Sequence, residues 1–399
     1  MKYIAIIGYG VVGGGITEVI DASREKIKSA VGDDVTVKYI LDLRDFPDSP
    51  YADRIVHDIT PILDDRDVSL VCETMGGSHP AYEFSVKCME VGKSVVTSNK
   101  EVVANFGDEL LGCAKKNGVF YMFEASVGGG IPCLRPFYTS LSDVVISKIN
   151  GIVNGTTNFI LTKMKEDGRG FSDVLAEAQS LGYAERDPSA DIDGIDAKRK
   201  IIILSALASG VLASENEVYA ESLRDISGDD MAAAEKLGGE IKYVATANFG
   251  EQNEVYVCPM IVKRTNPISS ISGVYNGISV TSLLTGDIMY YGRGAGRFPT
   301  AGAVLSDVVA VLSGAVKGEK IPVFKRGEGR IKPFDEVSFN VYLRTDCSSE
   351  ELCGRLETVA EKVEIISDDN GKTEAVVCGV TNAGLKSVLP DARVIRILE

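Results

Sequence analysis

The sequence KYIAIIGYGVVG, at residues 2–13, joins a short apolar run to a glycine-rich turn and the start of a helical pattern. In a strand–GxGxxG–helix context the first glycine permits a tight turn, and the second lets the backbone approach a pyrophosphate. The third lets the helix pack close to the strand, while the N-terminal amides of the helix face the phosphates. The residues expected to bind a dinucleotide here are Gly8, Gly10, Val11, Val12 and Gly13. The stretch therefore predicts a Rossmann-type domain.

Further apolar runs alternate with helical patterns through the first third of the chain. Strands are expected at 35–41, 68–73, 94–97 and 119–123, with a helix at 81–91. This alternation favours an α/β fold with a doubly wound parallel sheet, in which ligands bind beyond the carboxyl ends of the strands. Ser98 and Lys100 directly follow one such strand, and we expect both at the cofactor site. A lysine that merely begins a helix would have the same position.

The end of the second strand carries a mixed signal about the nucleotide. An acid there favours NAD by binding the ribose 2′-hydroxyl, whereas an arginine favours NADP. The sequence Asp42-Leu43-Arg44-Asp45 offers both. The choice between NAD and NADP therefore stays open.

The composition disfavours several other classes of protein. The 399 residues carry a net charge of −15, which argues against nucleic acid or an anionic membrane as a partner. With two histidines, eight cysteines and no CxxC pair, a Cys/His zinc site is nearly excluded. A cytoplasmic protein is favoured by three features of the sequence: its thiols are scattered, its N-terminus does not resemble a signal peptide, and it has no apolar run long enough to cross a membrane.

The strand–helix alternation changes character from about residue 134. The pattern predicts a strand at 148–153, helices at 158–165, 172–181 and 201–209, partly helical segments at 229–237 and 239–246, and antiparallel strands at 255–262 and 277–284. These elements are typical of an α+β domain with its own sheet. The last residues give a βαββαβ pattern of ferredoxin-like type.

These patterns predict three structural parts. A dinucleotide-binding domain is expected at 1–134, completed by about 300–318, which includes a helix at 302–312. A substrate-binding, catalytic and dimerisation domain is expected at 135–299. A polar, glycine-rich linker at 319–333 then leads to the ferredoxin-like module at 334–399.

Two more glycine-rich loops point to close backbone approaches. EASVGGGIP, at 124–132, has three consecutive glycines that could turn carbonyls onto a cation or amides onto an anion. A sharp turn between domains is the simpler alternative. GRGAGRFPTA, at 292–301, precedes a helix and could complete the cofactor site.

Residues 182–200 read GYAERDPSADIDGIDAKRK, an acidic loop that runs into a helix. On a helical wheel one stripe carries Asp196, Lys200, Ile203 and Leu207, and roughly opposite lie Lys198, Ser205 and Ser209. The Asp196–Lys200 pair therefore lies on a face that turns apolar, and we expect it to point inward. A charged pair on a buried stripe is a candidate for function, but an ordinary i,i+4 salt bridge has the same spacing.

Taken together, these motifs resemble those of homoserine dehydrogenases over about residues 1–312. They are GYGVVG from Gly8, VVTSNK from Val95, EASVGGGIP from Glu124, GIVNGTTNFIL from Gly151, GYAERDPSADIDGIDAKRK from Gly182 and GRGAGRFPTAGAV from Gly292. The resemblance implies NAD(P)-dependent, reversible reduction of L-aspartate 4-semialdehyde to L-homoserine, a step toward threonine, isoleucine and methionine. It also implies a dimer or tetramer formed through the second domain.

The resemblance assigns roles to the candidate residues. Lys200 and Asp196 match a catalytic pair, and Lys100 matches a lysine where cofactor and substrate meet. We expect Lys200 to donate the proton, because a desolvated lysine has its charged form disfavoured, but Lys100 stays an alternative donor. The positions that match substrate contacts are Glu185, Asp191, Gly155, Thr156 and Tyr183. Gly296 matches a glycine near the cofactor, and the main-chain carbonyls of Glu124, Val127, Gly129 and Ile131 match a site for a monovalent cation, Na⁺ or K⁺.

The C-terminal module resembles a reduced ACT-like regulatory domain. The loop after its first strand reads Asp346-Cys347-Ser348-Ser349 and lacks the glycine that such domains have there.

Two other functions stay in view. A semialdehyde dehydrogenase that makes an acyl phosphate needs a nucleophilic cysteine, and none of the eight lies in 182–200 or beside Lys100. A non-catalytic, NAD(P)-bound amino-acid sensor would rest on the C-terminal module alone.

Overall fold

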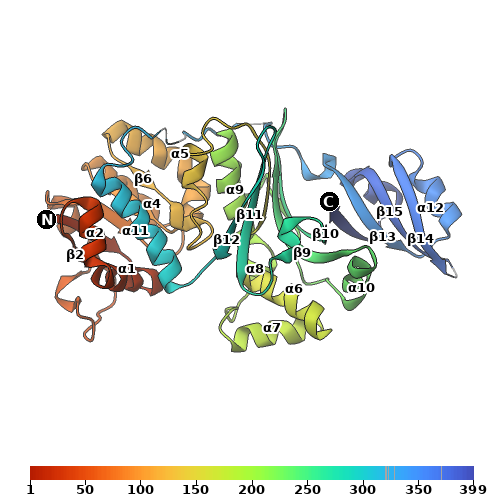
Figure 1. Ribbon diagram of the computed structural model, residues 1–399, viewed down its shortest axis with the longest axis horizontal. Helices are drawn as coiled ribbons and strands as arrows, with labels where there is room; N and C mark the ends of the chain where they lie inside the picture. Colours follow the sequence, from red (N-terminus) through yellow and green to blue (C-terminus); the bar gives the residue numbers. More distant parts are fainter. Residues whose placement is uncertain (320, 322, 328, 370) are drawn as a thin grey trace. The chain divides into compact units, whose positions relative to one another are not determined.

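The computed structural model describes the chain from Met1 to Glu399 apart from Lys320, Pro322, Glu328 and Asn370, so part of the expected linker lies outside the described residues (Figure 1). The chain forms two compact units. Unit 1 comprises Met1–Val145, Ile202–Glu215 and Tyr290–Gly327, and unit 2 comprises Ile146–Ile201, Asn216–Met289 and Glu328–Glu399. Two elements cross the division, α9 (Ile195–Ser209) and β12 (Gly286–Arg293).

Unit 1 contains the predicted parallel sheet. Its strands are β1 (Lys2–Ile7), β2 (Val35–Leu41), β3 (Ile55–Val56), β4 (Val68–Glu73), β5 (Ser94–Thr97) and β6 (Tyr121–Met122). Their order is β3-β2-β1-β4-β5-β6, so the chain reverses direction across the sheet between β1 and β4. This is the order of a doubly wound dinucleotide-binding sheet, whose crevice at the reversal binds the ligand.

Helices surround this sheet. They are α1 (Val11–Ala22), α2 (Arg24–Val31), α3 (Thr60–Asp64), α4 (Ala81–Glu90), α5 (Lys100–Asn117) and α11 (Arg297–Ser313), with short 3₁₀ turns η1 (Ala52–Arg54), η2 (Glu124–Ser126) and η3 (Arg135–Tyr138). The strands read as continuous apolar runs because both faces are covered; Ile4, Leu70 and Val95 are all fully buried. Helix α11 packs on α1 although almost 300 residues separate them in sequence.

Unit 2 is built on a mixed sheet (Figure 1). Its strand order is β12-β11-β7-β9-β10-β16-β13-β15-β14, with β8 beside β10. Its first strands are β7 (Ile146–Ile152), β8 (Tyr219–Ala220), β9 (Gly239–Asn248), β10 (Glu254–Lys263) and β11 (Tyr275–Ser282). Its first helices are α6 (Gly155–Asp167), α7 (Phe171–Ser180), α8 (Ser189–Ile192) and α10 (Gly228–Lys236), with the 3₁₀ turn η4 (Pro267–Ser270).

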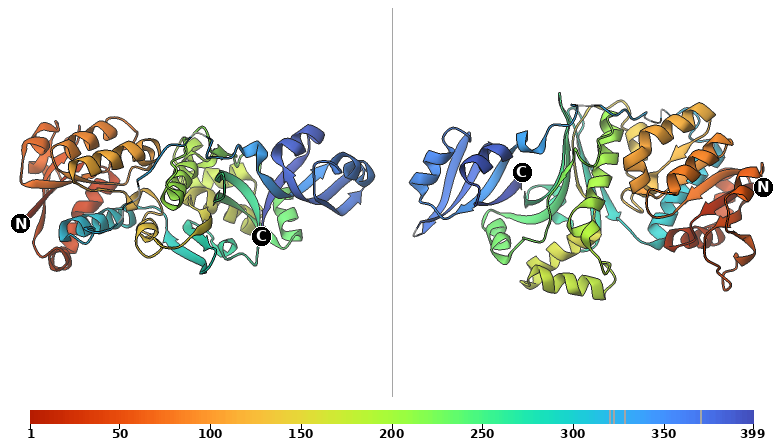
Figure 2. Two further views of the ribbon diagram at one scale, coloured as in Figure 1. Left: turned by 90° about the horizontal axis from the view of Figure 1, so that it is seen from above. Right: turned by 180° about the vertical axis from the view of Figure 1, so that it is seen from behind.

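The C-terminal residues form the predicted βαββαβ module. After η5 (Phe334–Glu336) it consists of β13 (Ser338–Thr345), α12 (Ser349–Leu356), β14 (Lys362–Asp369), β15 (Lys372–Thr381), α13 (Asn382–Val388) and β16 (Arg393–Leu398). Helices α12 and α13 lie on one face of its sheet (Figure 2). Leu352, Leu385, Val341 and Val377 belong to one buried apolar core. Ser349 N donates to Asp368 Oδ2 at 2.8 Å, so an internal carboxylate occupies the start of α12.

The module is continuous with the rest of unit 2. Strand β16 pairs in parallel with β10, and one apolar core contains residues from both parts of the sheet, such as Met260 of β10 and Val341 of β13. The compact units therefore group 328–399 with the middle of the chain, whereas the sequence pattern suggests a separate third part.

One element differs in kind from its prediction. Residues 239–246, expected to be partly helical, belong to the strand β9, which pairs with β10 along its whole length and with β7. Residues 241 and 243–247 are all buried, so both faces of β9 are covered. The sequence therefore lacks the alternation of apolar and polar residues that predicts a strand.

Three further elements differ from the prediction. Helix α11 begins at Arg297 rather than near Gly302, because Gly296, with φ 127°, forms its N-cap. Strand β6 is limited to Tyr121–Met122, and β12 had no counterpart in the sequence prediction. Ser205 of α9, which lies roughly opposite the Asp196–Lys200 stripe, is also fully buried. In the part of the chain that the structure describes, every helix falls short of the length and apolar character needed to cross a membrane.

Candidate active site

The centre of the site in unit 2 is the side chain of Lys200 on α9. Its Nζ donates to Asp196 Oδ2 at 2.7 Å and to the main-chain oxygen of Val153 at 2.6 Å. Lys200 and Asp196 are 8% and 7% exposed, which confirms the expected inward orientation of this pair. An ammonium has three donors, so these two acceptors leave one donor for a ligand.

Asn154 brings the two aspartates of the 182–200 stretch together. Its Nδ2 donates to Asp191 Oδ1 at 2.7 Å and to Asp196 Oδ2 at 2.8 Å. Its Oδ1 accepts from Thr157 N at 2.9 Å, so the same side chain caps the N-terminus of α6. Burial and the nearby Asp196 charge raise the pKa of Asp191, although the hydrogen bond from Asn154 opposes this.

The start of α6 lies beside this network. A Cβ on Gly155 would meet the Val274 carbonyl oxygen at 3.0 Å, so a side chain there would crowd the backbone. Thr156 Oγ1 donates to the Tyr183 carbonyl at 2.6 Å. The Tyr183 ring packs against Phe159 with centroids 4.9 Å apart, yet 45% of the residue stays exposed. These contacts join the predicted substrate residues of 155–156 to the loop at 182–185.

Glu185 and Asp193 differ from their neighbours in the stretch. Glu185 is exposed, so its carboxylate faces solvent or a ligand. Asp193 instead points to the segment after β8, where Arg224 donates to both of its oxygens at 2.9 Å. Arg224 holds the pKa of Asp193 below its ordinary value.

In unit 1 the turn between β1 and α1 has the form that its glycines predict. Gly8 has φ 92°, a left-handed conformation that favours glycine. A Cβ on Gly13 would lie 2.1 Å from the Gly8 carbonyl oxygen, so helix and strand approach as closely as a glycine allows. Gly10 has open space within 4 Å of its Cβ position, and as the N-cap of α1 it makes no side-chain cap. The turn therefore leaves the helix amides open to an anion.

A cavity of about 550 Å³ adjoins this turn, and Tyr9, Gly10, Val11 and Arg44 are among its lining residues. Asp42, at the end of β2, accepts from Tyr9 N at 2.8 Å and from Arg44 Nε and Nη2 at 3.0 and 3.1 Å. Burial opposes ionisation of this carboxyl, but its hydrogen bonds from Arg44 and Tyr9 hold the pKa of Asp42 at about 2. Asp42, which would favour NAD, and Arg44, which would favour NADP, thus form one ion pair.

The strand ends of β4 and β5 are joined through Glu73. Its Oε2 accepts from Thr97 Oγ1 at 2.5 Å, and burial raises the pKa of Glu73 to about 7. Asn99 caps α5 by accepting from Val102 N and donates to the Gly77 carbonyl at 2.8 Å. Lys100 is the first residue of α5 and is half-buried. Two residues earlier, the amide of Ser98 donates to the Glu73 carbonyl.

The glycine-rich loop after β6 packs on the loop before α11. Gly128 and Gly129 have positive φ values of 73° and 55°, and a Cβ on Gly129 would lie 2.5 Å from the Gly294 carbonyl oxygen. The buried Glu124 carboxylate accepts from the amides of residues 133, 134 and 135 at 2.6–2.8 Å. Its backbone amide donates to Asp307, whose pKa is raised by burial to about 8. Among the described residues, no group of three His, Cys, Asp or Glu side chains could hold a metal ion.

Sequence reasoning missed Asn154, although it lies in a quoted motif. It has no charge and no periodic pattern, and the one available signal was an asparagine directly before a helix start. Only the folded chain shows that it contacts Asp191 and Asp196, which are 37 and 42 residues away.

The order of the parallel sheet is that of a dinucleotide-binding protein, and the comparisons with known proteins place the chain among the NAD(P)-dependent oxidoreductases. A family model described as "Homoserine dehydrogenase" matches residues 132–309, and one described as "Homoserine dehydrogenase, NAD binding domain" matches residues 8–124. The chain belongs to the homoserine dehydrogenase family, which confirms the resemblance seen in its motifs.

Individual relatives agree with the family models. The homoserine dehydrogenase of Synechocystis is 37% identical over 359 residues, which cover 86% of this chain and 83% of that protein. The crystal structure of a homoserine dehydrogenase from Thiobacillus denitrificans has a TM-score of 0.91 at 30% identity and covers 100% of this chain and 98% of that one. A hyperthermophilic archaeal homoserine dehydrogenase in complex with NADPH has a TM-score of 0.66 at 28% identity, with 78% of this chain and 98% of that chain covered.

Proposed function

We propose that Lys200 supplies the proton when L-aspartate 4-semialdehyde is reduced to L-homoserine. The observation that carries this proposal is the buried Lys200 ammonium held by Asp196 and the Val153 carbonyl. With two donors occupied, the third can reach the aldehyde oxygen, where negative charge develops during reduction. Asp196 keeps the ammonium oriented, and in the reverse direction Lys200 in its neutral form accepts the proton of the alcohol.

The amino-acid end of the substrate is assigned to the loop half of the 182–200 stretch. Asp191 and the exposed Glu185 would accept hydrogen bonds from the substrate ammonium, since ion-assisted hydrogen bonds suit a small zwitterion. Gly155 and Thr156 at the start of α6 offer amides to the substrate carboxylate, and Tyr183 covers the site from the loop.

The nucleotide supplies or accepts the hydride in this reaction. Its pyrophosphate would bind the open amides at the start of α1, near Gly10, Val11 and Val12, with Gly8 and Gly13 shaping the turn. Gly296, Ser98 and Lys100 are assigned to the nicotinamide half. Lys100 is the second candidate for the proton donor and the better one if Lys200 proves dispensable.

The choice between NAD and NADP is assigned to the Asp42–Arg44 pair. In the present arrangement Arg44 neutralises Asp42, the acid that would otherwise bind a ribose hydroxyl. The Arg44 side chain is 65% exposed, so it can turn to a 2′-phosphate at little cost. We therefore assign NADP as the favoured nucleotide, with NAD as the alternative that Asp42 serves.

A monovalent cation is assigned to the main-chain carbonyls of Glu124, Val127, Gly129 and Ile131. The support is a loop with two consecutive left-handed glycines beside the buried Glu124 and Asp307 carboxyls, whose ionised forms burial disfavours and a cation would favour. Activity that is equal in sodium, potassium and tetramethylammonium salts at matched ionic strength would refute this assignment.

Self-association is assigned to the outer part of the unit 2 sheet. Leu283, Leu284, Ile288 and Met289 are 69%, 93%, 36% and 40% exposed at the β11–β12 hairpin, and an exposed apolar edge is typical of a surface that another copy covers. Sedimentation should give at least a dimer, and Leu284→Lys should weaken it.

Eight free thiols favour the reducing cytoplasm.

A direct assay tests the function. The purified chain is mixed with L-homoserine and either NADP⁺ or NAD⁺, and formation of reduced nicotinamide is followed by absorbance. We expect turnover that depends on homoserine and is faster at low NADP⁺ than at low NAD⁺. An acyl-phosphate-forming enzyme would need phosphate and the semialdehyde, and a sensor would bind nucleotide without turnover; either result would replace the present proposal.

A further inference from the structure

The residues between β8 and α10 lie in contact with both the catalytic stretch and the C-terminal module of unit 2. We call Glu221–Arg224 the bridging segment. Every contact described below joins residues of unit 2.

On one side the bridging segment holds the junction between α8 and α9. Leu223 N donates to the Ile192 carbonyl at 3.0 Å. Ser222 Oγ donates to Asp193 Oδ1 at 2.8 Å, and the Arg224 guanidinium donates to both Asp193 oxygens at 2.9 Å. These four contacts fix the residues that lie directly between Asp191 and Asp196.

Tyr243 tightens the same junction. Its hydroxyl donates to the Glu221 carbonyl at 2.6 Å and lies 2.2 Å from the Cβ position of Gly194. Gly194 has φ 82°, so both its conformation and its surroundings require glycine. The turn that starts α9 therefore fits closely against β9 and the bridging segment.

On the other side the bridging segment meets Arg396 of β16. Arg396 is 5% exposed, and its guanidinium is hydrogen-bonded to the Glu221 carboxylate and to Asn382 Oδ1. It also lies 4.8 Å and 5.1 Å from the ring centroids of Phe334 and Phe339. Because a buried guanidinium is costly without partners, Glu221 and Arg396 hold each other in place.

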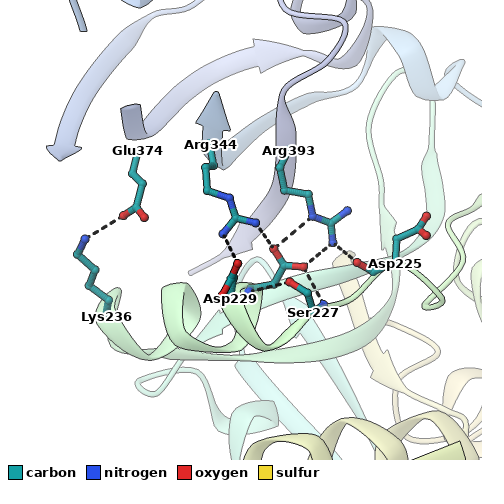
Figure 3. Close-up of polar contacts among 8 residues, drawn as sticks. Asp225, Ser227, Asp229, Lys236, Arg344, Glu374 and Arg393 are labelled. Carbon is teal, nitrogen blue, oxygen red and sulfur yellow. Dashed lines mark hydrogen bonds and ion pairs between the residues drawn. The ribbon is translucent and has the colours of Figure 1, made fainter. Parts of the chain in front are cut away.

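The chain that follows the bridging segment is also attached to the module (Figure 3). Asp230 of α10 is fully buried and accepts from Arg393 Nη2 at 2.7 Å, with Arg344 at 3.5 Å. Arg393 Nη2 donates to the Asp225 carbonyl at 3.1 Å, the residue directly after the bridging segment. Lys236 and Glu374 add a more exposed ion pair at 2.8 Å.

We propose that Glu221, Ser222 and Arg224 are positioning residues that set the placement of Asp191 and Asp196 around Asn154, and that the C-terminal module, through Arg396, keeps them in place. The module would thereby support catalysis without touching substrate. This inference rests on the proposed roles of Asp191, Asp196 and Lys200. It gives the module a task that needs no bound amino acid.

The physical reason is the short distance along the chain. Asp193 lies two residues after Asp191 and three before Asp196, and the carbonyl of the neighbouring Ile192 also accepts hydrogen bonds from the bridging segment. A shift of this turn moves both carboxylates relative to Asn154 and Lys200, and small misplacements of catalytic groups cost rate steeply. The loss should appear in kcat and in the KM for homoserine, since one carboxylate serves each.

The test uses the full chain and four variants of the two arginines, Arg224→Gln, Arg224→Lys, Arg396→Met and Arg396→Lys. We expect Arg224→Gln and Arg396→Met to lower kcat/KM for homoserine by about 3- to 30-fold, with the KM for NADP⁺ unchanged. The lysine variants keep the charge and should recover part of the loss. The double variant Arg224→Gln/Arg396→Met should lose less than the product of the single losses, because both changes release the same turn.

Controls separate this inference from the proposed chemistry. Lys236→Ala removes an exposed ion pair with Glu374 of the same module that does not involve the bridging segment, and it should match the wild type. Arg224 is 48% exposed at its side chain, so Arg224→Gln should fold even if Arg396→Met does not. Wild-type kcat and homoserine KM in a folded Arg224→Gln would overturn the inference, and so would fully multiplicative losses in the double variant. If Lys200→Ala is inactive while Arg224→Gln is normal, only the positioning role fails. If Lys200→Ala is active, the proposed role of Lys200 fails, and the positioning inference that rests on it fails as well.

Discussion

Lys200 Nζ lies 2.7 Å from Asp196 Oδ2, one helical turn away, and both residues are more than nine-tenths buried. Surface pairs of this spacing contribute little, whereas a buried pair has to offset the cost of removing both charges from water. Asn154 and the Val153 carbonyl supply that compensation. This compensated burial supports the proposal that Lys200 transfers the proton.

The first prediction concerns Lys200. Lys200→Ala should lower kcat by about 10²- to 10⁴-fold, the usual contribution of a general acid, with the KM for nucleotide little changed. Lys165→Ala on α6 removes only a surface ion pair with Glu240 and should leave kcat alone. Steady-state kinetics with homoserine and saturating nucleotide measures both. Near-normal turnover in Lys200→Ala would transfer the donor role to Lys100.

The second prediction concerns the loop acids. Glu185→Gln and Asp191→Asn should each raise the KM for homoserine by about 10-fold or more, since a hydrogen bond to a charged group is worth about 1.5–3 kcal/mol. The matched control is Asp187→Asn, because Asp187 lies in the same loop but bonds to Ser189 instead. An unchanged homoserine KM in both variants would refute the assignment of this loop to the substrate ammonium.

The third prediction concerns nucleotide choice. Arg44→Ala should raise the KM for NADP⁺ by about 10-fold and leave that for NAD⁺ equal or lower, because Asp42 is then free to accept from a ribose hydroxyl. Arg24→Ala, an exposed arginine at the start of α2, is the control. Parallel loss with both nucleotides would mean that Arg44 acts only by shaping the loop.

The fourth prediction concerns the turn after β1. Gly13→Ala places a methyl group 2.1 Å from the Gly8 carbonyl oxygen, so α1 has to move away from the sheet. We expect a loss of about 1–3 kcal/mol in the free energy of unfolding and weaker nucleotide binding. Gly112→Ala on α5 has open space around its Cβ position and should be neutral or stabilising. Thermal melting with and without NADP⁺ distinguishes the two variants.

The fifth prediction concerns Asp230 and pH. Its pKa is lowered below the ordinary value because Arg393 and Ser227 bind the ionised form more than burial disfavours it. A lowered pKa gives stability that is fully present above the ordinary aspartate pKa of about 3.9 and is lost as pH falls through the lowered value. Asp230→Asn should therefore destabilise the fold by about 3–5 kcal/mol at neutral pH.

The difference between Asp230→Asn and wild type should shrink on acidification below pH ~4, because both then lack the charge. Urea unfolding at neutral and acid pH measures it. A constant difference across this range would show that Asp230 acts by packing alone.

Local pattern was enough to predict much of unit 1. The limits of β1, β2, β4 and β5 follow from apolar runs bounded by turn residues, and the tight packing at Gly13 follows from the glycine spacing. The inward face of Asp196 and Lys200 follows from the helical period. In each case the information lies within about ten residues, which is the range over which period and turn chemistry operate.

Long-range pairing could not be predicted in this way. Residues 239–246 form a strand because β7 and β10 lie on either side, whereas their own sequence was interpreted as partly helical. Asn154 is held by hydrogen bonds to Asp191 and Asp196. Arg396 is held by a hydrogen bond to Glu221, which lies 175 residues earlier in the chain. Such contacts arise when the folded sheet brings distant side chains together, and a side chain's partners across that distance leave no trace in the residues beside it. The residue types of the site are thus present in the sequence, whereas their hydrogen bonds, burial and mutual support come from the folded chain.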